Sequence, residues 1–77
     1  MSRKIKLLWD FRGEDAAETA KHHTIHLKEF AVQEQLAFHE IGIQEKNQML
    51  CSAFITVAET EMSTYRDALQ PHRGELG

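Results

Sequence analysis

Hydrophobic and polar residues alternate along the first part of the chain. From residue 3 to residue 11, apolar side chains recur at every second position, which is the spacing of a β-strand with one buried face. Between about residues 15 and 35 they recur at steps of three and four, so they form one stripe along a helix. The chain is therefore expected to begin with a strand and a long amphipathic helix.

Two more strands and a second helix are predicted in the second half of the chain. Residues 38–45 alternate as the first strand does. Residues 49–58 are apolar on both faces, which is typical of a strand that is covered on both sides. A shorter amphipathic helix is expected from about residue 60 to residue 69, where Pro71 prevents it from continuing.

The connection between the two later strands is expected to be a tight hairpin turn. Lys46 and Asn47 lie between the two patterns, and Asn accepts the positive φ angle that a two-residue turn requires. With these two residues as the loop, Ile43 is expected to pair with Leu50.

The order β-α-β-β-α predicts a single α+β domain over residues 1–77, with an ordered core at about 3–70 and a C-terminal tail at 71–77. These are the first five elements of a ferredoxin-like fold. They predict an antiparallel three-stranded sheet with two helices on one face, and the tail is either loose or a short edge strand. Because this fold hosts many unrelated functions, it does not specify an activity.

A three-stranded sheet with both helices on one face leaves its other face uncovered. Since residues 49–58 are apolar on both faces, a monomer is expected to expose an apolar patch on the order of several hundred Å², which is typical of an interface. Stacking two sheets around a two-fold axis would cover this patch. We therefore expect a sheet-to-sheet homodimer, which would also offset the thin stability margin of a 77-residue chain.

Charge and cysteine content limit the partners and the compartment. The formal net charge of −3 at pH 7 and the scattered basic residues argue against a nucleic-acid partner. No apolar run approaches the ~20 residues of a membrane span, so no membrane association is expected. Cys51 is the single cysteine, which excludes an internal disulfide and favours a reducing compartment. We expect a cytoplasmic protein.

Three histidines lie close together in the predicted long helix, and two of them resemble a metal site. His22 and His26 are four residues apart and therefore share a helix face with two carboxylates. Imidazole and carboxylate groups together suit a transition metal, although nothing in the sequence requires one. The candidate ligands are Glu18, His22, His26 and Glu29, with Asp10, His39 or His72 as a further ligand. The alternative is that His22 and His26 are solvated, because the zinc motif His-Glu-x-x-His is absent.

The third histidine, His23, lies between Ala20 and Leu27 in the apolar stripe of the same helix and is expected to face the sheet. A buried neutral imidazole needs partners for its donor and its acceptor. One interpretation is therefore a core histidine that bonds to a backbone carbonyl, a water or Tyr65.

The second interpretation of His23 is a ligand pocket. Ala16 and Ala20 would leave space between the helix and the sheet, and His23 would be the polar group in it. Burial would also lower its pKa, which suits a general base, so His23 and His39 are candidate catalytic residues. The candidate ligand-binding residues are Trp9, His23, His26 and Tyr65.

Three functions follow from these alternatives. The first is a homodimeric α+β domain of unknown function that holds a small ligand around His23. The second is a metal-binding protein that uses His22 and His26 with a nearby carboxylate. The third is a small enzyme, either a proton-transfer isomerase or an oxygenase-like dimeric barrel.

Overall fold

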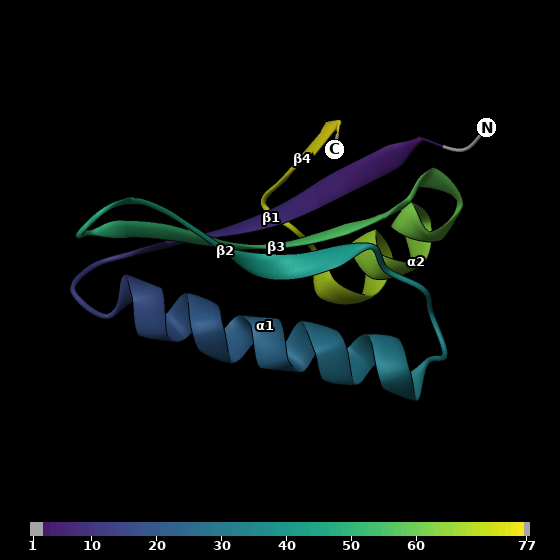
Figure 1. The fold of residues 1–77 in the computed structure, drawn as a ribbon, viewed down its shortest axis with the longest axis horizontal. Helices are drawn as coiled ribbons and strands as arrows, with labels where there is room; N and C mark the ends of the chain where they lie inside the picture. Colours follow the sequence, from purple (N-terminus) through teal and green to yellow (C-terminus); the bar gives the residue numbers. More distant parts are fainter. Residues whose placement is uncertain (1–2, 77) are drawn as a thin grey trace.

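The helices and strands of the computed structural model, which describes residues 3–76, follow the predicted order and add one strand. They are β1 (Lys4–Arg12), α1 (Ala16–Gln33), β2 (Glu40–Asn47), β3 (Leu50–Ala58), α2 (Glu59–Leu69) and β4 (Arg73–Leu76). The five predicted elements are confirmed, and their ends differ from the predicted ones by at most two residues. Both helices lie on the same side of the sheet (Figure 1), so the chain is an α+β domain.

The strands form one antiparallel sheet in the order β2-β3-β1-β4. The prediction of three strands is wrong, because part of the predicted tail forms β4 along the free edge of β1, with Leu8 opposite Arg73 and Ile5 opposite Leu76. A segment of four residues is too short to show an alternating pattern. Its pairing depends instead on β1, which lies far away in the sequence.

The turn between β2 and β3 lies two residues later than predicted, at Gln48 and Met49. Asn47 pairs with Leu50, and its side-chain Oδ1 accepts a hydrogen bond from the Met49 backbone N–H at 2.8 Å. Asn47 therefore closes the turn with its side chain and without a positive φ angle. The predicted pairing of Ile43 with Leu50 is wrong as a result, and Ile43 lies opposite Ala53.

The alanines near the start of α1 pack on the sheet. Ala16 and Ala20 are buried against Cys51 and Ala53 of β3. Small side chains on both elements let the helix approach the sheet closely. The ligand pocket expected beside these alanines stays a prediction. The larger core side chains pack further along the helix, around Leu27 and Tyr65.

The sheet face that points away from the helices is not the apolar patch that the sequence predicts. Ser52 is fully buried, and Phe54 and Thr56 are each 8 % exposed. Lys6 covers Phe54, with its Nζ 4.2 Å from the centre of the ring, and the Ser52 hydroxyl donates to Asp10. This sheet face therefore does not need a second sheet to cover it.

Candidate functional site

His23 packs between α1 and β1, against two aromatic rings. Its ring centre lies 4.8 Å from that of Trp9 and 5.5 Å from that of Phe11. Its Nε2 atom is buried and has no hydrogen-bond partner among the described residues. Burial lowers the pKa of His23, and positive charge on His26 and His72 lowers it further. His23 therefore faces the sheet, and its surroundings favour the neutral imidazole.

Two other candidate ligand-binding residues have structural partners. The Tyr65 hydroxyl donates to the carbonyl oxygen of Ala37 at 3.2 Å, so it does not serve His23. The Trp9 indole N–H donates to the carbonyl oxygen of Leu69 at 2.9 Å, and its ring contacts His23. These bonds tie α2 and the segment before β2 to the core, which is a structural role.

The four candidate metal ligands are exposed along α1; they are Glu18, His22, His26 and Glu29. Within residues 3–76, no group of three or more His, Cys, Asp or Glu residues is arranged to hold a metal ion. Two of the possible further ligands already have partners. Asp10 bonds to Ser52 and Arg73, and the Nδ1 of His72 accepts the Asp10 backbone N–H at 2.8 Å. The metal site therefore stays a prediction.

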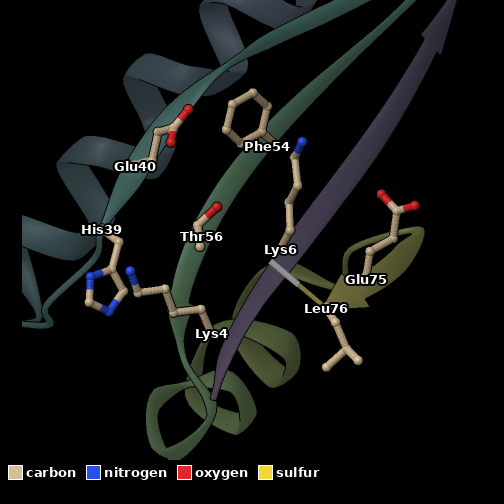
Figure 2. A pocket seen from close by; sticks show the side chains of 8 residues that line it. All are labelled: Lys4, Lys6, His39, Glu40, Phe54, Thr56, Glu75 and Leu76. Atoms are coloured by element: carbon tan, nitrogen blue, oxygen red, sulfur yellow. The ribbon is translucent and has the colours of Figure 1, made fainter. Parts of the chain in front are cut away.

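His39, the second candidate catalytic histidine, does not join His23. It borders a hollow of about 600 Å³ on the sheet face away from the helices, which we call the sheet-face basin (Figure 2). The basin is lined by Lys4, Lys6, His39, Glu40, Phe54, Thr56, Glu75 and Leu76. His23 and His39 therefore belong to different sites.

Strand pairing assembles the basin from segments that are far apart in the sequence. Glu40 and Lys6 both lie opposite Thr56, and Glu75 lies opposite Lys6, so these four residues form one row across the sheet. The sequence does not predict this site, because it leaves open whether the tail forms an edge strand and favours a different register for β2. The one available signal was the placement of Lys4 and Lys6 on the same face of a strand.

The two lysines of the basin have no carboxylate partner. Neither Lys4 nor Lys6 takes part in a salt bridge within the described part of the chain. The Lys6 Nζ donates to Gln44 Oε1 at 3.1 Å, and the Glu75 carboxylate lies 3.7 Å from Arg73. Figure 2 shows the Lys4 ammonium group beside the His39 imidazole, while the carboxylate of Glu40 is directed away from this pair.

A network next to the basin attaches β4 to the sheet. The Ser52 hydroxyl donates to Asp10 Oδ1 at 2.5 Å, and the Arg73 guanidinium donates to both Asp10 oxygens, at 3.2 and 3.3 Å. The hydrogen bond from Ser52 lowers the pKa of Asp10, Arg73 lowers it further, and burial opposes this shift. Because β4 also provides Glu75 and Leu76, this network helps to position one wall of the basin.

Comparison with known protein families, with characterised proteins and with solved structures found no match. Between residues 3 and 76, no helix has the length and apolar character needed to cross a membrane.

Proposed function

We propose that this domain binds a small organic anion, such as a carboxylate or a phosphate ester, in the sheet-face basin. The observation that supports this is the unpaired Lys4 ammonium group beside His39, at the edge of a hollow of about 600 Å³. Small-molecule sites commonly measure roughly 300–1,000 Å³ and contain few polar groups. A cation without a protein partner attracts an anion more strongly at such a concave surface than in open water.

The basin also provides groups that would orient such a ligand. His39 offers a ring N–H donor, and the hydroxyl of Thr56, on the floor of the basin, can donate or accept a hydrogen bond. Phe54 and Leu76 add apolar surface for a carbon skeleton. We propose binding and not catalysis, because the two histidines expected to cooperate, His23 and His39, lie in different sites.

We also propose that the architecture is ferredoxin-like. The connectivity β-α-β-β-α-β and the sheet order β2-β3-β1-β4 support a ferredoxin-like fold. Since that fold hosts unrelated functions, only the basin supports the proposed binding of an anion.

The proposal is tested by NMR titration of the full chain with inorganic phosphate and, separately, with succinate. We expect saturable shifts of the backbone amides of Lys4, Thr56 and Glu75. Lys4→Gln removes a charge-assisted contact worth about 1.5–3 kcal/mol, so it should weaken binding roughly tenfold or more.

The matched control is Lys21→Gln, which removes the same charge from an exposed position on α1. It should leave the affinity unchanged. Shifts that do not saturate, or an equal loss of affinity in both variants, would show that the anions screen surface charge without occupying the basin.

A further inference from the structure

The outer surface of α1 carries two large aliphatic side chains that the core does not use. Ile25 is 55 % exposed and Val32 is 68 % exposed. They are seven residues apart, which is about two helical turns, so they lie in one stripe. A hollow of about 500 Å³ lies along this stripe and is also lined by Lys28, Glu29 and Gln33. We call these five residues the outer α1 surface.

A second hollow extends the apolar surface towards β2. It measures about 480 Å³, shares Ile25 and Lys28 with the first, and also includes Phe38, which is 37 % exposed, and Ile41. The core-facing stripe of α1 is a different one, with Ala20, Leu27 and Ala31 buried. The solvent-facing side of a helix is usually polar, so these exposed side chains indicate a contact surface.

We propose that a second copy of this chain covers the outer α1 surface, with the two α1 helices antiparallel around a two-fold axis between Lys28 and Glu29. In such a pair, residues at equal distances from the axis face each other. Ile25 then faces the partner subunit's Val32, and Lys28 faces the partner subunit's Glu29. Each apolar contact and each ion pair occurs twice.

Repulsion between like charges disfavours the two neighbouring registers. With the axis at residue 28, Lys28 would face its own copy, and with the axis at residue 29, Glu29 would do so. Both arrangements place like charges together, which is unfavourable. The register between them pairs Lys28 with the partner subunit's Glu29, so opposite charges meet. This self-complementarity is why the proposed occupant is a second copy.

The proposed dimer is weak and leaves the sheet face free. A contact built on one helix with two exposed aliphatic side chains lies below the roughly 1,200–2,000 Å² that stable interfaces bury in total. Dimerisation therefore depends on protein concentration. The five residues of the outer α1 surface do not line the sheet-face basin, which lies on the other side of the sheet. The second hollow, towards β2, shares His39 and Glu40 with the basin.

Sedimentation velocity of the full chain over a wide concentration range tests the interface. We expect a monomer–dimer equilibrium that Val32→Asp abolishes. The control Met49→Asp changes an apolar side chain of similar exposure, 52 %, in the turn after β2 and should leave the equilibrium unchanged. A monomer at every concentration, or a dimer that persists in Val32→Asp, overturns the proposal.

Charge reversal tests the two-fold register. Lys28→Glu alone and Glu29→Lys alone each place like charges together and should weaken the dimer, whereas the double variant restores opposite charges and should recover it. An additive loss in the double variant contradicts the register.

Cross-linking tests the antiparallel arrangement of the two α1 helices independently. In a mixture of the Ile25→Cys and Val32→Cys chains, oxidation should form a covalent dimer that neither variant forms alone. The native Cys51 is buried and does not compete. Equal cross-linking of either variant by itself rules out the antiparallel arrangement.

Discussion

At the scale of single residues, His23 is the least satisfied group of the core. Its Nε2 is buried without a hydrogen-bond partner among the described residues, a situation that typically costs about 1–3 kcal/mol. The side chain nevertheless packs against Trp9 and Phe11, so the ring contributes apolar contacts that offset part of this cost. Protonation of His23 would add a positive charge, and neither the Trp9 nor the Phe11 ring offers it a hydrogen-bond acceptor.

The lowered pKa of His23 predicts that acid destabilises the fold. An unfolded histidine titrates near about 6.5. Because the folded pKa lies below this value, the unfolded chain binds the proton first as the pH falls. The stability that depends on neutral His23 is fully present above a pH of about 6.5 and is lost as the pH falls towards the folded pKa. His26 and His72, the charged neighbours of His23, act in the same direction when they are protonated.

Urea unfolding at about pH 8 and about pH 5 measures this effect. His23→Phe retains a ring between Trp9 and Phe11 but cannot titrate, so it should lose less stability on acidification than the unmodified chain. His22→Phe alters an exposed neighbour and should keep the full pH dependence. Equal pH dependence of both variants would mean that His23 is not the responsible group.

At the scale of elements, the packing of the Phe54 ring of β3 against β2 requires a glycine at position 42. The Phe54 ring lies over Gly42, and a Cβ atom at that position would be 3.1 Å from its Cζ. Lys6 covers the other side of the same ring and donates to Gln44 of β2. The ring is therefore held between a backbone and an ammonium group, which explains why an aromatic residue on the outer sheet face is only 8 % exposed.

Gly42→Ala should displace the Phe54 ring and destabilise the fold by about 1–3 kcal/mol, the usual cost of overpacking. Gly74→Ala is the matched control, because a Cβ there meets its nearest neighbour, Leu7, at an ordinary 3.6 Å. Chemical denaturation should show a loss for the first variant and little change for the second. Similar midpoints for both would show that the Phe54 ring has room to move.

At the scale of the whole molecule, β4 pairs the C-terminal segment of the described chain with β1. It covers the free edge of β1 with the pairs from Leu8 and Arg73 to Ile5 and Leu76, and Leu8 is fully buried. Arg73 also provides the ionic partner of Asp10. A small domain has little stability to spare, so the loss of an edge strand affects the entire fold.

Removal of residues 73–77 should therefore lower the free energy of unfolding by about 2 kcal/mol or more, because it leaves Asp10 without its cation and the edge of β1 unpaired. Leu76→Ala shortens a side chain that is 74 % exposed and should have a small effect. Thermal unfolding followed by circular dichroism measures both. A truncated chain that melts like the full chain would show that β4 is dispensable.

The sequence by itself determined the five elements whose patterns are local. Alternation at every second position specifies β1 and β2, and steps of three and four residues specify α1, because both periods are set by backbone geometry. The apolar character of β3 on both faces agrees with its place between β2 and β1. The position of His23 in the apolar stripe of α1 was likewise sufficient to predict that it faces the sheet.

Only the tertiary structure decided which segments meet. The strand β4 forms because β1 has a free edge, and the sheet-face basin exists because Lys4, His39 and Glu75 are brought together from distant segments. On the outer sheet face, Lys6 covers the Phe54 ring, a contact that the sequence alone does not predict. These features depend on contacts between residues far apart in the chain, and a local pattern carries no information about such contacts.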